Sequence, residues 1–262
     1  MPILSSITVD AWSMVTTPLD LMRGDLVLAK GSGFFWRNTK GEVLLGSCWH
    51  NFTGVDPVTG VALSHHGGRP TAVKFWAPTP GNGNNRLIIE RPLYDEEGNA
   101  LWLVHPSLRQ NADVVALPVG PVPEFLHYVN EVDNFPLRRV VGMDVFVLGY
   151  PEGISRDWCP VWKRGSLALE PQMVCDEEPF TLIDTATRAG MSGALVVQRA
   201  IGFALHEGSD NVSPRTTATR FFGVYSGRFA TKDEFGAHLG IVWPSDLFER
   251  IAEDGVRDAF FA

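Results

Sequence analysis

Short apolar stretches alternate with turn-forming residues along the whole chain. Each stretch is four to eight residues long and rich in Val, Ile, Phe or Trp, a pattern typical of β-strands. The predicted strands are residues 25–29, 33–37, 43–47, 71–77, 87–90, 113–119, 145–150, 162–169, 180–184, 194–198, 221–226 and 239–244. The sequence Asn38-Thr39-Lys40-Gly41 between two of these strands predicts a hairpin turn.

One segment near the end of the chain has helical periodicity. Leu247, Phe248 and Ile251 fall on one face of a predicted helix over Ser245–Asp254, with Ser245 as its N-cap. A series of short strands followed by one terminal helix predicts an all-β barrel or sandwich architecture. Residues 118–139 are poorer in strand pattern and are predicted to connect two halves of the chain.

The composition is that of an ordinary globular protein. The 262 residues are 45% hydrophobic and 20% charged, which excludes a disordered or collagen-like chain. The chain has 22 Lys and Arg against 30 Asp and Glu, a net charge of −8, and no basic run. We therefore expect neither nucleic acid nor a membrane surface as a partner. The N-terminal sequence lacks the basic and apolar regions of a secretory signal, so we expect a cytoplasmic protein.

Cysteine and histidine usage gives no metal-binding pattern. Cys48, Cys159 and Cys175 are an odd number for a disulfide framework, and reduced thiols are the expectation without an export signal. One bridge between Cys159 and Cys175 remains an open alternative. None of the three lies in a CxxC pair, and His65-His66 is followed only by glycines, so no metal site is expected.

Three segments place reactive side-chain types at the ends of predicted strands. His50 follows the strand over residues 43–47, where a hairpin gives way to a loop. Asp113 heads an apolar strand, and Ser192 lies in a glycine-flanked turn that a strand follows at once. A serine hydroxyl needs a base to remove its proton before it attacks an amide, and a histidine has a suitable pKa near ~6.5. The three segments are therefore a candidate nucleophilic site.

The motifs GSGFFW, DVVAL, VFVLGYPEG, GMSGALV and GVYSGR, in this order, resemble chymotrypsin- and trypsin-like serine peptidases. The resemblance is nearest to the bacterial trypsin-like and HtrA-type branch, here without length for a PDZ domain, and it covers roughly residues 25–250. The order His50, Asp113, Ser192, with separations of 63 and 79 residues, is also the order of that family.

The resemblance implies an all-β fold of two packed six-stranded antiparallel β-barrels with a C-terminal helix. Residues 1–120 are expected to form the first barrel, with His50 and Asp113, and residues 121–262 the second barrel, with Ser192. The implied activity is a serine endopeptidase that hydrolyses polypeptides through an acyl-enzyme, with no cofactor and no metal.

Each residue of the implied triad has an expected role. Ser192 is the nucleophile, His50 its base, and Asp113 fixes the tautomer of the histidine. Asp95 and Asp133 are rivals for the third role, but neither is followed by an apolar strand.

The glycines around the serine have expected roles too. The backbone N–H groups of Gly190 and Ser192 are expected to form an oxyanion hole. Gly193 is expected to leave room for substrate backbone. Met191 stands where digestive members carry an acid, so their zymogen switch should be missing.

Substrate-binding positions follow from the resemblance alone. It places the floor of the P1 pocket at Ala186, where the absence of charge argues against a preference for Lys or Arg. It also makes Ser226-Gly227-Arg228 the strand that pairs with substrate backbone, with Ser226 bonding Asp113. For Arg228 and Arg188 two alternatives stay open, a contact to an acidic substrate residue or an ordinary surface charge.

Three alternatives to a general peptidase stay open. The first is a catalytically silent or partner-activated binding module, in which the oxyanion turn is collapsed and Gly190 does not present its N–H group. The second is an esterase or other acyl hydrolase with a short acyl pocket, and the third is a processing enzyme with one target. A regulatory protein partner is compatible with each of them.

Overall fold

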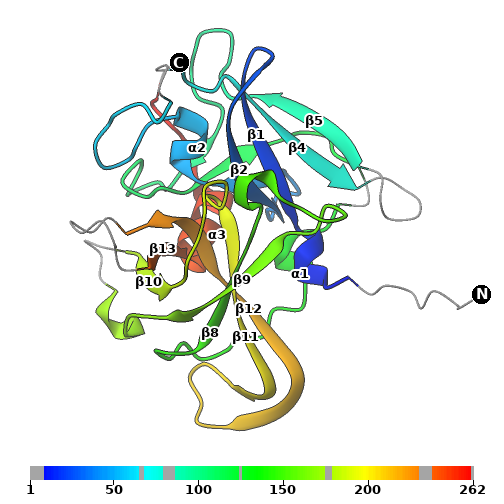
Figure 1. The fold of residues 1–262 in the computed structure, drawn as a ribbon, viewed down its shortest axis with the longest axis vertical. Helices are drawn as coiled ribbons and strands as arrows, with labels where there is room; N and C mark the ends of the chain where they lie inside the picture. The colour runs from blue at the N-terminus through cyan, green and yellow to red at the C-terminus, as the bar shows by residue number, and fades with distance from the viewer. Residues whose placement is uncertain are drawn as a thin grey trace, which may run out of the picture.

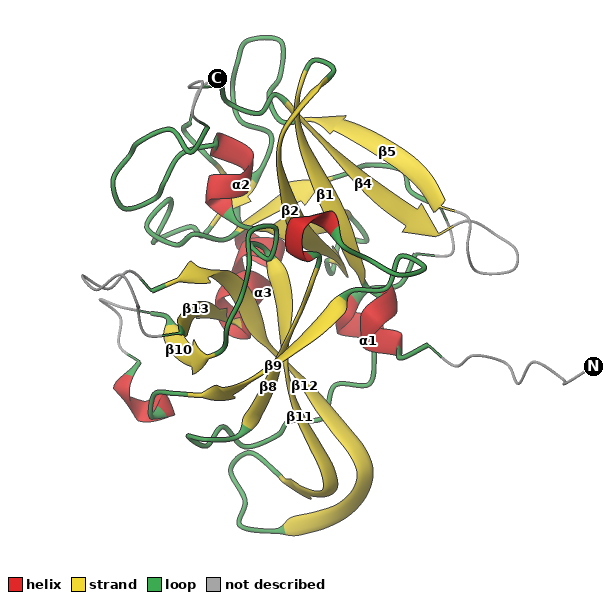
Figure 2. Ribbon diagram, viewed as in Figure 1, coloured by secondary structure: helices red, strands yellow, loops and turns green. Residues whose placement is uncertain are grey.

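The computed structural model describes residues 9–64, 68–78, 86–123, 126–174, 179–229 and 238–260. Strands are the main regular elements of these residues, and they form two antiparallel units that lie one above the other in Figures 1 and 2. His65, His66 and Cys175 lie outside the described residues, so the predictions about them remain predictions.

The first unit is an eight-stranded antiparallel sheet in the order β14-β6-β7-β3-β2-β1-β4-β5. Its strands are β1 (Thr16–Arg23), β2 (Leu26–Arg37), β3 (Val43–Ser47), β4 (Ala72–Pro78), β5 (Arg86–Pro92), β6 (Leu103–Val104), β7 (Val115–Pro118) and β14 (Val256–Arg257). Two short helices, α1 (Ala11–Met14) and α2 (Trp49–Thr53), accompany it. The unit has two strands more than the resemblance implied, and β14 returns to it from the end of the chain.

The second unit is a closed six-stranded barrel in the order β10-β13-β12-β11-β8-β9. Its strands are β8 (Asp144–Gly149), β9 (Val161–Leu167), β10 (Thr181–Asp184), β11 (Ala194–Leu205), β12 (Val212–Arg228) and β13 (Leu239–Pro244). Helix α3 (Ser245–Asp254) follows β13, and three 3₁₀ turns, Val129–Glu131, Pro151–Gly153 and Pro171–Met173, lie in the connections. The all-β class with a C-terminal helix is confirmed.

Several elements differ from their predicted bounds. β2 is one strand of 12 residues that joins two predicted strands. β11 and β12 are longer than predicted and form a hairpin that extends away from the barrel in Figure 1. Ser245 is the first helical residue and not the N-cap; Pro244 holds the cap position, and no side chain caps the helix.

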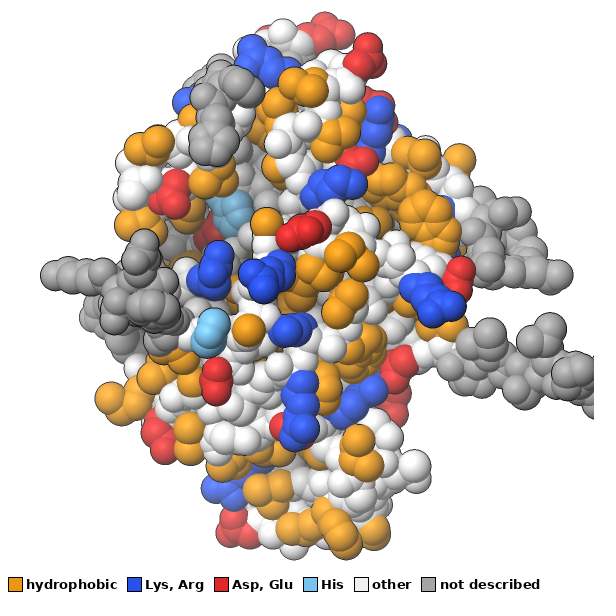
Figure 3. Space-filling view, in the orientation of Figure 1, with side chains coloured by type: hydrophobic (Ala, Val, Ile, Leu, Met, Phe, Trp, Pro, Cys, Tyr) orange, Lys and Arg blue, Asp and Glu red, His pale blue; other side chains and the backbone are white. Residues whose placement is uncertain are grey.

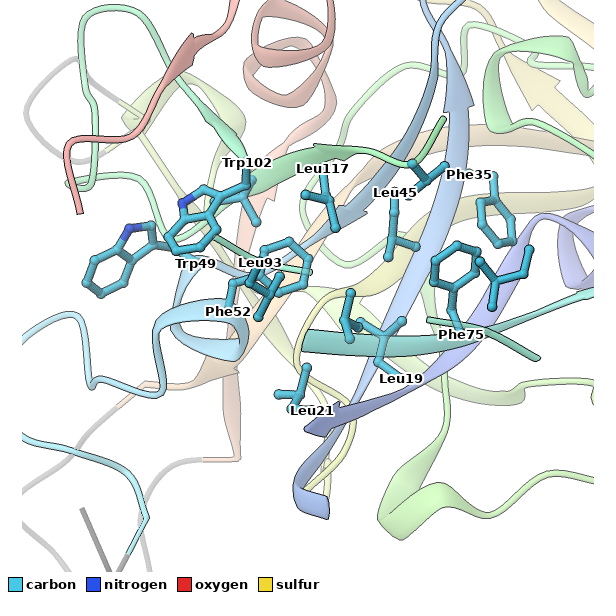
Figure 4. Packing of buried hydrophobic residues seen from close by; sticks show 14 of the residues in the cluster. Leu19, Leu21, Phe35, Leu45, Trp49, Phe52, Phe75, Leu93, Trp102 and Leu117 are labelled. Carbon is cyan, nitrogen blue, oxygen red and sulfur yellow. The ribbon is translucent and has the colours of Figure 1, made fainter. Parts of the chain in front are cut away.

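Buried hydrophobic clusters fill the first sheet and the junction between the two units. One fills the interior of the first sheet and includes Leu19, Phe35, Phe75 and Trp102 (Figure 4). The other joins the sheet, the barrel and α3: Phe34 of β2 meets Phe248 of α3 edge-on at 4.7 Å between ring centroids. Because aromatic burial of this kind is a large part of packing energy, this cluster fixes the two units relative to each other. Among the described residues, no helix is long and apolar enough to cross a membrane.

Candidate active site

Strand pairing brings His50 and Asp113 together. β3 leads through Cys48 into α2, which contains His50, and β7 begins two residues after Asp113. β3 and β7 are paired with Ser47 opposite Val115, so the two flanking segments leave the sheet side by side. His50 Nδ1 lies 2.6 Å from Asp113 Oδ2, and the His50 backbone N–H donates to Oδ1 at 2.9 Å. The carboxylate therefore fixes both the ring and the backbone of the histidine.

Ser226 adds a contact from the barrel. This residue lies near the end of β12, and its Oγ donates to Asp113 Oδ2 at 2.5 Å. The bond expected between Ser226 and Asp113 is thus present. Asp113 is buried, whereas the His50 ring is 14% exposed and so reaches the surface.

The environment of His50 raises its pKa. Burial lowers the pKa of the ring, but the negative charge of Asp113 and its hydrogen bond raise it by more, and Asp56 adds a smaller effect. The net pKa lies above the ordinary value of 6.5. Stabilising the imidazolium in this way suits a group that must accept a proton during a reaction.

Ser192 is held against the first unit by its own carbonyl. Ser192 O accepts from Ser32 N of β2 at 2.9 Å and from Asn51 Nδ2 of α2 at 3.0 Å. Asn51 is the residue next to His50, so this bond ties the serine to the helix of the histidine. Within the described residues no hydrogen bond joins Ser192 Oγ to the His50 ring. Such bonds are often long without substrate and tighten in the complex.

The turn before Ser192 has a defined peptide orientation. Ala189 O accepts from Glu152 N at 2.7 Å, and Gly190 O accepts from Ser32 Oγ at 2.8 Å. Because a trans peptide directs its N–H opposite to its C=O, the Gly190 N–H faces away from Glu152. In the described part of the chain neither Gly190 N nor Ser192 N has a hydrogen-bond acceptor. Two free N–H groups on one turn are the arrangement that an oxyanion hole requires.

Glycine at 190 is a requirement of this turn. Gly190 has a φ of +89°, and a Cβ there would lie 2.6 Å from Tyr150 O and 2.7 Å from Glu152 N. Gly193 has a different role from the one expected. A Cβ at 193 would overlap Ser32 O and Ser47 Oγ, so this glycine makes room for the first unit and not for substrate backbone.

Cys48 lies beside the histidine and the carboxylate, and its Sγ, His50 and Asp113 offer ligand atoms within 4.8 Å of one another. These three residues belong to a hydrogen-bonded cluster. Cys48 Sγ donates to Tyr225 O at 3.3 Å, while the oxygens of Asp113 accept from His50 and Ser226. Burial, together with the charge of Asp113, raises the pKa of the Cys48 thiol well above its usual range. The thiol therefore stays protonated and takes part in this cluster as a hydrogen-bond donor.

The remaining predicted positions differ in exposure. Ala186, Arg188 and Arg228 are exposed, Gly227 is half-buried, and a Cβ on Gly227 would meet nothing within 4 Å. Met191 is buried in the barrel core, where digestive members would place a charge. Lys and Arg side chains gather across the middle of the face in Figure 3, where the two units meet.

Some residues that hold the site in place were not predicted from the sequence. Ser32 and Asn51 contact the serine turn from 158 and 141 residues away. Ser32 stands within the GSGFFW motif and Asn51 beside His50, so each had a signal, but neither had a partner that the sequence could indicate.

Comparisons with known proteins give a likeness in structure only. No family model and no curated protein matches the sequence. The structure is similar to the serine endoprotease from Yersinia pestis, at 14% identity and a TM-score of 0.51, over 90% of this chain and 60% of that chain. It is also similar to the Rv3671c protease from M. tuberculosis in its active form, at 16% identity and a TM-score of 0.50, over 95% of this chain and 85% of that one. The chain therefore has the trypsin-like serine protease fold.

Proposed function

We propose that the protein is a serine endopeptidase that cleaves polypeptides through an acyl-enzyme. The observation that carries the proposal is the network in which Asp113 accepts from both N–H groups of His50, beside a turn whose Gly190 N–H is free. The fold, shared with proteases at low identity, supports it. Ser192 acts as nucleophile, His50 as base and then acid, and Asp113 as the group that orients the histidine.

The reaction begins with attack by Ser192 Oγ on the carbonyl carbon of a peptide bond, as its proton passes to His50 Nε2. The carbonyl oxygen gains the negative charge and accepts hydrogen bonds from Gly190 N and Ser192 N. The C–N bond then breaks, His50 gives its proton to the leaving amine, and an ester joins the acyl group to Ser192. Water loses a proton to His50 and attacks the ester. The C–O bond to Ser192 breaks, Oγ regains the proton, and a carboxylic acid leaves.

The end of β12 supports binding of an extended peptide. The last pair between β11 and β12 is Ala194 with Tyr225, so residues 226–228 pair only with β13 among the described strands. On their other edge, the backbone groups of residues 226–228 have no hydrogen-bond partner among the described residues, and this edge begins where Gly193 N donates to Tyr225 O. An added strand is a general way to bind peptides, and open space at Gly227 allows one to approach. This edge favours a peptidase over an esterase with a closed acyl pocket.

Peptide hydrolysis by substituted proteins tests the proposal. Wild type should cleave a mixed fluorogenic peptide library, and Ser192→Ala and His50→Ala should each lose about 10⁴-fold or more in rate. Ser213→Ala and His206→Ala are the matched controls, because both lie at the far end of the β11–β12 hairpin. Equal activity in wild type and Ser192→Ala would overturn the proposal. A folded wild type without activity would favour a binding module that a partner activates. The cytoplasmic location and a regulatory partner remain predictions.

A further inference from the structure

One aromatic ring occupies the barrel end beside the nucleophile. Tyr225 precedes Ser226 on β12, and neighbouring side chains on a strand point to opposite faces. Ser226 points to Asp113, whereas the Tyr225 side chain packs inside the barrel, where it is 2% exposed. It belongs there to a buried cluster with Met191 and Val242. The ring therefore lies under the segment that carries Ser192.

The hydroxyl of Tyr225 connects the ring to residues 185–188. It is hydrogen bonded to Thr187 Oγ1, on the segment that leads to the serine turn. Thr187 is buried, whereas its neighbour Ala186 is exposed. The contact spans the gap between residues 185–188 and the end of β12. This buried contact lies next to Ala186, where the resemblance placed the floor of the P1 pocket.

The Tyr225 ring fills the space in which a side chain at position 240 would lie. Gly240 lies on β13, and a Cβ there would be 2.5 Å from Tyr225 Cε2. Arg228, two residues after Ser226, adds charge near the same ring. Burial raises the pKa of Tyr225, while the bond to Thr187 and the positive charge of Arg228 oppose the increase. The Tyr225 ring therefore narrows the space between residues 185–188 and β12, and the charged residue Arg228 lies near the edge of that space.

We propose that Tyr225, braced by Thr187, limits the acyl side chain of the substrate to Gly, Ala or Ser. This inference rests on the proposed function, which places the peptide along residues 226–228 with its carbonyl at Gly190 and Ser192. The side chain of the residue that acylates Ser192 then enters between residues 185–188 and β12. It meets the Thr187–Tyr225 contact after a short distance, so longer side chains clash with a ring that the core holds in place.

Matched peptides that differ only at the acylating residue test this limit. Wild type should cleave after Ala with a kcat/KM at least about tenfold above that after Leu, Phe, Lys or Glu, since such a gap is typical of a pocket one or more methylenes too small. Tyr225→Ala should raise kcat/KM after Leu and Phe relative to Ala by about tenfold or more. Tyr225→Phe keeps the ring and loses only the hydroxyl, so it should keep the order of the wild type.

Labelling with a small-alkyl fluorophosphonate separates the two proposals. An unlabelled wild type contradicts the proposed function. A labelled wild type that prefers Leu, Phe, Lys or Glu contradicts the size limit alone, as does a Tyr225→Phe that prefers large residues. Should Tyr225→Ala fail to fold, the wild-type and Tyr225→Phe rankings still decide the matter.

Discussion

Ser32 Oγ, on β2 of the first unit, donates a 2.8 Å hydrogen bond to Gly190 O, on the turn before the nucleophile. The same hydroxyl accepts from Tyr150 N at 2.9 Å. Both bonds are buried, and they cross from the sheet to the barrel. Ser32 thereby sets the orientation of the peptide that follows Gly190, although the two residues are 158 positions apart in sequence. The relative position of the two units and the shape of the oxyanion turn depend on the same side chain.

Replacing Ser32 should affect stability and reactivity together. Ser32→Ala leaves Gly190 O and Tyr150 N without a partner, and an unsatisfied buried polar group costs about 1–3 kcal/mol. Because two such groups lose their partner, we expect the free energy of unfolding to fall by about 2–6 kcal/mol and the fluorophosphonate labelling rate to fall by at least about tenfold. Urea denaturation and labelling kinetics measure the two effects. Ser213→Ala, on the hairpin, should change stability by about 0.5 kcal/mol or less; an equal effect from both substitutions would contradict the role of Ser32.

Gly190 and Gly202 make a matched pair, because both have left-handed φ values, +89° and +87°. A Cβ at Gly190 would collide with Tyr150 O, whereas one at Gly202 would meet nothing within 4 Å. Both alanine variants carry the ~1 kcal/mol strain of a left-handed residue, but only Gly190→Ala should displace the turn and abolish peptide hydrolysis. Comparable activity in the two variants would show that the turn does not contribute the expected donors.

Activity should depend on pH through His50. The histidine must be neutral to accept the serine proton, so activity is present above its pKa and is lost as the pH falls through it. Although burial lowers this pKa, Asp113 raises it more, so the acid limb of kcat/KM should have its midpoint above 6.5. Asp113→Asn removes the charge, which should move the midpoint to lower pH and reduce the rate by about 10⁴-fold. A pH–rate profile of both proteins measures this, and an unmoved midpoint would exclude Asp113 as the partner.

The end of the chain supports the histidine helix through Asp258. Trp49 and Trp102 donate their indole N–H groups to Asp258 Oδ2 at 2.7 and 2.9 Å, and their rings lie near each other in Figure 4. Asp258→Ala leaves two buried donors unsatisfied, so the free energy of unfolding should fall by about 2–5 kcal/mol. Asp254→Ala, which breaks an exposed ion pair with Arg250, should cost less than about 0.5 kcal/mol. Similar denaturation midpoints for the two variants would contradict this role.

The sequence predicts elements well where the apolar pattern and burial coincide. β3, β13 and α3 have their predicted bounds, and the apolar residues that predicted them, such as Leu45, Val242 and Phe248, are buried. β1 was missed because Pro18 and Asp20 interrupt its apolar pattern, yet it pairs with both β2 and β4. Proline and aspartate are depleted in strands, so tertiary pairing and not local preference establishes β1.

The site is predictable to the extent that it is local. His50, Asp113 and Ser192 stand in motifs, and the pairing of β3 with β7 brings the first two together. The contacts of Ser32 and Asn51 cross between the units, where no periodicity in the sequence reports the partner. The bond from Ser226 to Asp113 also crosses between the units, and only the family resemblance indicated it. The packing of the Tyr225 ring under Ser192 is likewise not predictable from the sequence, because it depends on the separate positions of Tyr225, Thr187 and Gly240 in the barrel.

An activated Ser192 is the central claim, and fluorophosphonate labelling of the folded protein tests it most directly. Mass spectrometry of the digested protein should show one adduct, on the peptide that contains Ser192, in wild type. The adduct should be absent in Ser192→Ala and form at least about 10³-fold more slowly in His50→Ala. A folded wild type that takes no adduct, or takes it equally well without His50, would contradict the account.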